Sequence, residues 1–171
     1  MSSALVRLAP LLEGAAESPL KRWWLDRALG RIIPFNQGHR LSIRTVNREQ
    51  VSILLPFRRA NRNHLGSLHA CALATAAEYA AGLLLLRNLA GIECRIIMRE
   101  LRMSYERQGR GDAVAECRAS GVELSGARHR IAGGEVVEIT LRSELRDGAG
   151  EVLCRGETSW QIRGKNIEVS Q

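Results

Sequence analysis

Hydrophobic residues recur at helical spacing in two segments of the chain. The first runs from about residue 19 to residue 31; a Ser18-Pro19 pair typical of a helix start precedes it, and Pro34 ends it. The second, residues 70–86, is apolar over almost its whole length, is rich in alanine and contains a single carboxylate, Glu78. Because alanines let neighbouring backbones approach closely, we predict that this second helix is buried within the protein.

Six other segments show the two-residue alternation that is typical of β-strands. They span about residues 41–45, 51–57, 93–107, 112–120, 137–142 and 152–162. Turns at Gly109–Gly111 and Asp147–Gly150 separate strands in the second half of the chain. Runs of strands, rather than a strict alternation of strands and helices, predict an α+β fold with a largely antiparallel sheet that covers the long helix.

The composition suits one globular domain with an aliphatic core. The 171 residues are 45% hydrophobic and 25% charged but only 4% aromatic. A net charge of +7 invites an anionic partner, such as nucleic acid, an acidic membrane surface or a phosphorylated ligand. The basic residues are scattered along the predicted strands without a nucleic-acid-binding motif, so we expect a solvated basic surface and no nucleic-acid partner.

Cysteine spacing and the apolar segments bear on metal binding and location. The four cysteines form no CxxC pair, which disfavours a zinc or redox site, and the N-terminal residues lack a convincing secretion signal. Residues 70–86 fall short of the ~20 apolar residues of a membrane span and carry Glu78 at their centre. We therefore predict a cytoplasmic protein with reduced thiols, no metal and no membrane span.

Glu78 is the candidate for chemistry, because an ionised carboxylate in an apolar setting is costly unless it is paired. It must meet a partner, face water, or have a raised pKa suited to acid–base catalysis. No cation shares its face of the helix. The polar loop ahead of the helix offers Ser67 as a plausible N-cap, which would leave the backbone N–H groups of Leu68 to Ala70 free to hold a developing oxyanion.

Helical geometry separates Glu78 from that helix start within one chain. Glu78 follows His69 by nine residues, which is about 13.5 Å along the axis and roughly half a turn around it. In a two-fold dimer, however, Glu78 of one subunit can face the helix start of the other. The sequence therefore predicts that any such site is shared between two subunits.

The loop and helix resemble a known family. Asn63-His64-Leu65-Gly66-Ser67-Leu68-His69-Ala70-Cys71, with Glu78 nine positions after the histidine, resembles the N-x-x-G-[ST]-x-H-G-G…[DE] signature of hotdog acyl-CoA thioesterases of the phenylacetate-pathway type. Pro56 to Glu78 is closer still to the PFRRxNRNHxGSxHACAxAxxAE motif of another hotdog branch. The likeness covers about Phe35 to Arg163.

The resemblance implies a fold, an assembly and an activity. The fold would be an antiparallel sheet of about six strands around one long central helix, with residues 1–34 as an N-terminal helical extension and residues 35–171 as the hotdog domain. The assembly would be a homodimer or a dimer of dimers. The activity would be hydrolysis of an acyl-CoA or related thioester, with coenzyme A as part of the substrate and no separate cofactor.

The resemblance also implies catalytic roles. Glu78 would act as general base or nucleophile, and Asn63 would position water or substrate. Ala70 stands where the family has a glycine whose backbone N–H polarises the thioester oxygen, and it keeps that N–H. His69 would brace the loop. The family's HGG has become HAC here, which would narrow the acyl pocket.

Substrate contacts would come from the loop and from nearby arginines. Gly66 would let the loop approach the ligand, and we place His64 and Ser67 beside it. Three arginines precede the helix and could bind the phosphates of coenzyme A, with two more as further candidates. They are Arg58, Arg59 and Arg62, then Arg128 and Arg130.

Other interpretations remain open. A hotdog dehydratase would pair His64 with Glu78 across subunits, and a non-catalytic protein would bind acyl-CoA or lipid with Glu78 as a structural acid. His69 could serve only the helix start, Asn63 could be a turn residue, and Cys71 would then be a small buried hydrophobe. The Trp23–Trp24 helix could cap the pocket or pack on the sheet.

Overall fold

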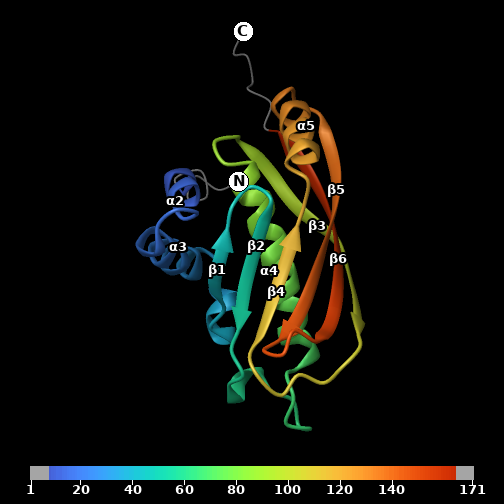
Figure 1. The fold of residues 1–171 in the computed structure, drawn as a ribbon. Coiled ribbons are helices and arrows are strands. Elements are labelled where there is room, and N and C mark those ends of the chain that lie inside the picture. The colour runs from blue at the N-terminus through green and yellow to red at the C-terminus, as the bar shows by residue number, and fades with distance from the viewer. Residues whose placement is uncertain (1–7, 165–171) are drawn as a thin grey trace.

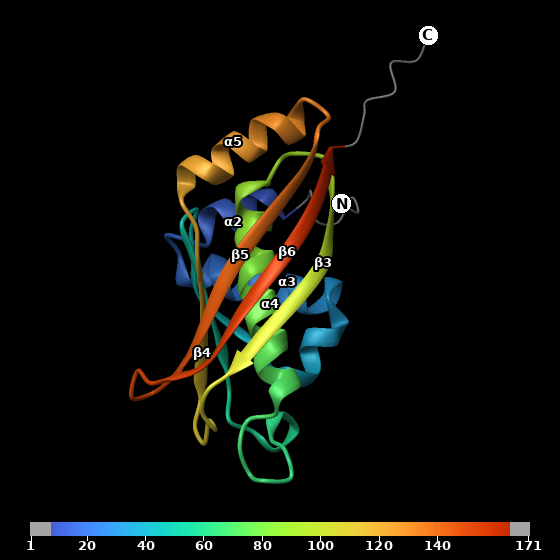
Figure 2. The ribbon, with the colours of Figure 1, turned by 90° about the vertical axis from the view of Figure 1, so that its right-hand side faces the viewer.

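The described chain forms one antiparallel sheet around a long helix. This computed structural model describes residues 8–164, except for the side chains of residues 122 and 123. The strands are β1 (Ser42–Val46), β2 (Gln50–Leu55), β3 (Cys94–Tyr105), β4 (Ala113–Arg118), β5 (Val136–Asp147) and β6 (Val152–Gly164), in the order β1-β2-β4-β5-β6-β3. Helix α4 (Ala70–Asn88) lies against the concave face of the sheet (Figures 1 and 2). The predicted hotdog architecture is confirmed.

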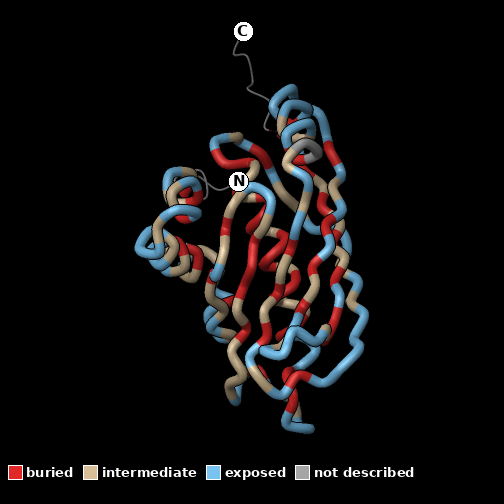
Figure 3. Tube along the Cα trace, in the orientation of Figure 1, coloured by how far each residue is buried: buried red, intermediate tan, exposed pale blue. Residues whose placement is uncertain are grey.

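Small residues let α4 pack directly on the sheet. A Cβ atom added to Gly156 of β6 would lie 3.0 Å from the Cβ of Ala77 and 2.9 Å from the Sδ of Met103. Figure 3 shows buried residues gathered along α4 and along the strands beside it. By length and composition α4 could cross a membrane, but 61% of its most apolar window is buried inside the protein. Its apolar character is therefore explained by its place in the core.

Side-chain hydrogen bonds and a glycine stabilise the turn of the long β5–β6 hairpin. The Asp147 carboxylate accepts hydrogen bonds from the backbone N–H groups of Ala149 and Glu151, both at 3.0 Å. Gly150 has a φ of 85°, which favours glycine. The predicted turn is present, but β5 extends five residues beyond its predicted end at residue 142. Its pairing with β6 continues to Arg146 opposite Val152, with a shift of register between Leu145 and Arg146.

The N-terminal segment packs on the same core. It contains α2 (Ala9–Gly14), α3 (Pro19–Ile32) and the 3-10 helix η1 (Pro34–His39). The Ser18 hydroxyl accepts a hydrogen bond from Lys21 N–H, as expected for an N-cap. Leu25 and Leu29 are fully buried in the cluster that contains the α4 core residues. The division at residue 34 stays a prediction, but these contacts tie α3 to the hotdog core.

Two α-helices were not predicted from the sequence. One is α2, and the other is α5 (Gly121–Ala132), which lies between β4 and β5 in the chain. The Arg128 guanidinium donates hydrogen bonds to the backbone carbonyls of Asn88 and Ala90, at 2.7 and 2.9 Å, where α4 ends. α5 is thus fastened by a tertiary contact that local sequence patterns do not record.

Asp26 of α3 is a half-buried carboxylate that fastens this helix to β1. Both of its carboxylate oxygens accept a hydrogen bond from Ile43 N–H at 3.1 Å. Burial raises the pKa of Asp26 to about 6, against the lowering effects of that hydrogen bond and of Arg22. A carboxyl group whose pKa is higher in the folded state binds its proton more tightly there. The free energy of unfolding therefore falls as pH rises from the unfolded-state pKa to the folded-state pKa.

We therefore expect Asp26→Asn to stabilise the protein at neutral pH. The amide keeps an acceptor for Ile43 N–H but carries no charge. Two pKa units correspond to about 2.7 kcal/mol, and partial solvation reduces this to roughly 1–2 kcal/mol of added unfolding free energy at pH 8. At pH 4 the gain should vanish. Urea denaturation of both proteins at pH 4 and pH 8 checks this, and an equal difference at both pH values would contradict it.

Candidate functional site

Glu78 faces an apolar cavity of about 350 Å³ beside α4. The cavity is lined by Ile33, Asn36, Glu78, Tyr79, Gly82, Leu83, Leu86, Arg95, Ile96 and Trp160. Burial raises the pKa of Glu78, and within residues 8–164 no hydrogen bond or ion pair compensates its charge. A carboxylate that is partly desolvated and unpaired is a better proton acceptor than an ordinary exposed glutamate.

The chain before α4 is held by Asn61, which is fully buried. Its amide nitrogen donates to the backbone carbonyls of His39 and Pro56, both at 2.9 Å, and its side-chain oxygen lies 3.0 Å from His39 Nδ1. Its backbone carbonyl accepts from His69 N–H at 2.8 Å. Asn61 therefore joins η1, the end of β2 and the start of α4 into one unit.

The helix N-cap is His69, so the prediction of Ser67 at this position is wrong. His69 Nδ1 accepts a hydrogen bond from Cys71 N–H at 3.1 Å. Ser67 is instead buried in the preceding loop, where its hydroxyl bonds to Asn63. The ring of His69 thus has the structural role at the helix start that one of the sequence interpretations gave it.

Of the backbone N–H groups of Leu68 to Ala70, which were predicted to be free at the helix start, two are already hydrogen-bonded. Leu68 N–H donates to Gly109 O and His69 N–H donates to Asn61 O, both at 2.8 Å. In the described part of the chain Ala70 N–H has no acceptor, and Ala70 is exposed. The Tyr105 hydroxyl, at the end of β3, donates a hydrogen bond to the Ala70 carbonyl at 3.0 Å, which fixes the next peptide unit, between Ala70 and Cys71. One free N–H therefore remains at the helix start.

The turn before α4 is held together by its own hydrogen bonds. It contains Asn63, His64, Gly66 and Ser67. The Asn63 side-chain oxygen accepts from Leu65 N–H and Ser67 N–H, and its amide nitrogen bonds to the Ser67 hydroxyl at 3.0 Å. Gly66 has a φ of 72°, which favours glycine. The polar groups of Asn63 thus organise the turn. His64 is exposed at the tip, and no hydrogen bond within the described chain joins it to Glu78.

The arginines fall into two groups. Arg58, Arg59 and Arg62 lie beside the loop and form no ion pair with any residue in 8–164; Arg62 stacks over Phe57, with its guanidinium carbon 5.2 Å from the ring centroid. Arg128 and Arg130 lie on α5, at the opposite end of α4. Arg130 pairs with Glu135 at 2.8 Å. Within one chain, only the first group borders the helix start.

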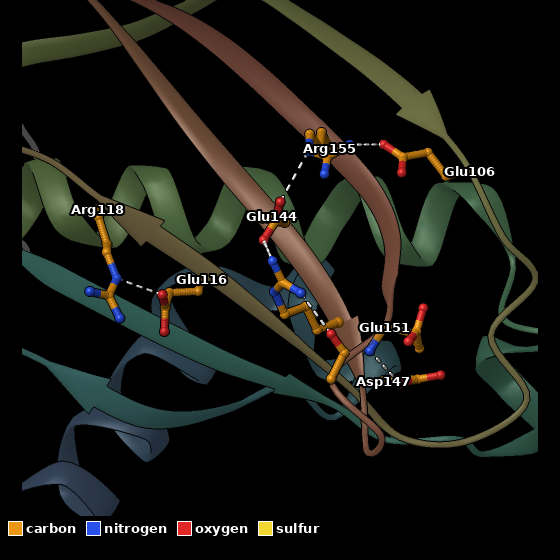
Figure 4. Close-up of polar contacts among 9 residues, drawn as sticks. Glu106, Glu116, Arg118, Glu144, Asp147, Glu151 and Arg155 are labelled. Atoms are coloured by element: carbon orange, nitrogen blue, oxygen red, sulfur yellow. Dashed lines mark hydrogen bonds and ion pairs between the residues drawn. The ribbon is translucent and has the colours of Figure 1, made fainter.

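Another hollow, about 790 Å³, lies on the face of the sheet away from α4 and is lined mostly by charged side chains. Glu144 pairs with Arg155 at 3.0 Å and also with Arg146, while Arg155 reaches Glu106 (Figure 4). Arg118 pairs with Glu116 at 2.6 Å. Glu116–Arg118 and Glu144–Arg146 pair within one strand, whereas Glu144–Arg155 joins β5 to β6. Because these side chains neutralise one another, we interpret them as a surface charge network rather than a binding site.

Two further predictions concern cysteines and metal. Cys71 is exposed, so its prediction as a buried hydrophobe is wrong, whereas Cys94, Cys117 and Cys154 are buried. All four are free thiols. Within the described residues, no group of three or more His, Cys, Asp or Glu side chains is placed to hold a metal ion.

Three site residues were missed by sequence reasoning. Asn36 lines the Glu78 cavity, Asn61 fixes the loop, and Tyr105 fixes the Ala70 peptide. Asn61 lies within the recognised motif, so that signal was present. Asn36 and Tyr105 lie far from it in the chain, and nothing in their local sequence distinguishes them.

Glu78 and Ala70 N–H are not brought together within one chain. Eight residues of helix separate them, which is about 12 Å of axial rise. Each group is accessible at its own place: the Glu78 carboxylate borders the cavity, and Ala70 is exposed at the helix start. A single subunit therefore holds both parts of the predicted site, but at separate places.

Solved structures with this fold include proteins named as thioesterases. Protein PA5026 of Pseudomonas aeruginosa, named as a probable thioesterase, is 28% identical, with a TM-score of 0.74 over 82% of this chain and 94% of that one. Protein OLEI01261 of Chlorobaculum tepidum, of unknown function, is 17% identical, with a TM-score of 0.76 over 88% and 99%. Thioesterase HI1161 of Haemophilus influenzae is 10% identical, with a TM-score of 0.62 over 84% and 94%.

The family assignment rests on a match over most of the chain. None of the curated proteins compared with the chain matches it. Residues 21–162 match the family described as Domain of unknown function (DUF4442), and this match begins inside α3 and ends inside β6. The chain therefore belongs to the DUF4442 family and has the hotdog fold of the thioesterases that it resembles.

Proposed function

We propose that the protein hydrolyses an acyl thioester at a site shared between two subunits. The observation that carries the proposal is Glu78: an unpaired carboxylate with a raised pKa in an apolar cavity, on the central helix of a hotdog fold. The thioesterase names of two structural neighbours support the same reaction class. The acyl group would occupy the Glu78 cavity, whose volume of about 350 Å³ falls at the lower end of ordinary ligand pockets.

The free edge of the sheet supports a dimer. Among the described strands, β3 pairs with β6 alone, so within residues 8–164 its other edge offers unpaired backbone groups along twelve residues. Met98 and Tyr105 are exposed large side chains on this strand. Pairing of two β3 strands about a two-fold axis would cover that edge and bring the helix start of each subunit toward the Glu78 cavity of the other.

The reaction uses groups that each subunit supplies. Glu78 accepts a proton from water, and the water oxygen attacks the thioester carbonyl carbon. The Ala70 N–H of the other subunit donates a hydrogen bond to the oxyanion of the tetrahedral intermediate. Collapse of the intermediate breaks the C–S bond and releases a carboxylic acid and a thiol, which takes up a proton.

Thiol release is the direct test. Wild-type protein should release free thiol from at least one member of a panel of short, long and aryl acyl-CoAs. Hydration of an enoyl thioester without free thiol would instead favour the dehydratase interpretation with His64. Saturable binding of an acyl-CoA without turnover of any panel member would favour a non-catalytic carrier or sensor.

The arginines beside the loop should recognise the phosphates of coenzyme A. We expect simultaneous Arg58→Ala, Arg59→Ala and Arg62→Ala substitutions to raise KM for acyl-CoA by roughly 10- to 100-fold with little change in kcat. This range corresponds to the loss of about one charge-assisted hydrogen bond, which contributes about 1.5–3 kcal/mol. An acyl-pantetheine that lacks the nucleotide phosphates should show no such change. Arg130→Ala, which breaks a pair on α5, is the matched control. An equal loss with both substrates would contradict the assignment.

A further inference from the structure

Arg87 is a buried arginine in the last turn of α4. It is 9% exposed, and no described residue forms a hydrogen bond or an ion pair with its guanidinium group. The Nε atom is enclosed by protein, whereas the two terminal nitrogens keep accessible surface. Burial, and then the nearby charge of Arg48, lower the pKa of Arg87. Because a desolvated charge is costly without a counter-charge, the terminal nitrogens of Arg87 call for an anionic partner.

The side chain of Arg87 lines a small hollow of about 70 Å³ at the end of α4. Two more arginines reach the same hollow, Arg48 from the turn between β1 and β2 and Arg128 from α5. One water molecule needs ~10–15 Å³ of such space, so the hollow has room for a small ion and not for a nucleotide.

The backbone carbonyls beside the hollow are used by other donors. Arg128 Nη1 donates to the carbonyls of Asn88 and Ala90, at 2.7 and 2.9 Å. Asn88 Nδ2 donates to the carbonyls of Arg48 and Leu84, both at 2.9 Å. These bonds fix the wall of the hollow. Nε and Nη2 of Arg128 form no hydrogen bond with any described residue, so they are available to a ligand.

Carboxylates of the described chain do not neutralise this wall. Glu13 of α2 lines the hollow, but it is exposed and forms no ion pair with the three arginines. Glu49 lines a different hollow. Three arginines and one glutamate give the described lining residues a formal charge of +2. A tetrahedral oxyanion suits this wall, because its oxygens can accept hydrogen bonds from several guanidinium groups at once.

We propose that this hollow binds one tetrahedral oxyanion, either inorganic phosphate or the phosphate of a small monoester, through the guanidinium groups of Arg48, Arg87 and Arg128. Arg87 follows Glu78 by nine residues, which is about 13.5 Å along the helix axis, and it lies at the end of α4 away from Ala70. The site is therefore separate from the proposed thioester site and does not depend on it. The bound anion would join α5 to the end of α4.

Calorimetry tests the proposal with two probes. The protein, in a chloride buffer without phosphate, is titrated with inorganic phosphate and with glycerol 3-phosphate at constant ionic strength. We expect one phosphate ion per chain, with saturation below about 10 mM. Binding of both probes would assign a site that accepts phosphate monoesters, and binding of inorganic phosphate alone would assign a site for the free ion.

Three variants separate a built site from general charge attraction. Arg48 is exposed in a turn, so Arg48→Ala should keep the fold and weaken phosphate binding by about tenfold or more, the effect of one charge-assisted hydrogen bond. Arg87→Met should abolish binding. Without phosphate it should raise the melting temperature, because it removes a buried charge that has no partner. Arg44→Ala removes an exposed arginine outside the hollow and should bind phosphate as the wild type does.

Several results would overturn the proposal. Lack of saturable phosphate binding by the wild type would mean that the chain supplies the counter-charge itself. Wild-type affinity in Arg48→Ala, or an equal loss of affinity in Arg44→Ala, would exclude the hollow as the site even if Arg87→Met failed to fold. A folded Arg87→Met protein that melts below the wild type in phosphate-free buffer would show that Arg87 already has a partner within the chain.

Discussion

Glu78→Gln lowers the turnover of a susceptible acyl-CoA by about 10²- to 10⁴-fold, the usual contribution of a general base. Glutamine keeps the length and shape of the side chain but cannot accept the proton of the attacking water. Since the substrate still has its cavity and its oxyanion donor, we expect KM to change much less than kcat. Steady-state thiol release by wild type and variant measures the effect.

The stability of the same variant is its control. Burial raises the pKa of Glu78, so the ionised form destabilises the folded state at a pH above that pKa. Glutamine removes this cost, and the melting temperature of Glu78→Gln at pH 8 should equal or exceed that of the wild type. A fully active variant would contradict the base assignment, and an inactive one that has lost its fold or dimer would not support it.

The pH dependence of the wild-type activity should also show that Glu78 acts as the base. The base acts only when ionised, so kcat/KM should fall as pH falls through the pKa of Glu78. Because burial raises that pKa, the acid limb should lie above the ordinary glutamate value of about 4.3. A pH–rate profile from pH 4 to pH 9 locates this limb.

Ala70→Pro removes the proposed oxyanion donor without removing the helix. Ala70 is the first helical residue after the N-cap, a position where proline is well accommodated, and its N–H bonds to no other described residue. His69 has a φ of −71° and a ψ of 137°, an extended conformation that suits a residue before proline. We expect kcat to fall by about 10²- to 10³-fold, the usual effect of losing one oxyanion donor.

Ala70→Gly is the matched control for this substitution. It retains the N–H group and matches the glycine of the thioesterase signature, so thiol release should stay close to the wild-type rate. Circular dichroism of both variants checks that α4 persists. Equal rates for Ala70→Pro and the wild type would mean that another group stabilises the oxyanion.

The fold was predictable because its main elements follow local patterns. The apolar alanine-rich stretch predicts α4, and alternation predicts all six strands. Helix α5 was not predictable, because Arg128 fastens it to carbonyls at the end of α4, 38 and 40 residues away in the chain. The full length of β5 was missed because the buried Ser143 interrupts its apolar alternation, and the hydrogen bond from the Ser143 hydroxyl to the Ala77 carbonyl is a tertiary contact.

For the candidate site, only those residues that lie within one sequence motif could be predicted. Glu78, Ala70 and the arginines of the loop lie within a short stretch. Within the described chain, the Glu78 carboxylate and the Ala70 N–H have no hydrogen-bond partner, and the three guanidinium groups have no ion-pair partner. Ser67 was misplaced as N-cap because its hydroxyl is taken by Asn63. Asn36 could not be found, because its place beside Glu78 depends on how η1 borders the cavity that α4, β3 and β6 also line.

The most direct test of the shared site is a dimer that contains one Glu78→Gln subunit and one Ala70→Pro subunit. The two proteins are co-expressed with different tags, and the mixed dimer is isolated through both tags. One of its two sites would combine both substitutions, and the other would combine intact Glu78 with the intact Ala70 N–H of the partner. A shared site therefore predicts about half of the wild-type turnover per dimer, although each mutant homodimer is nearly inactive. Turnover as low as that of the homodimers would contradict a site formed between subunits.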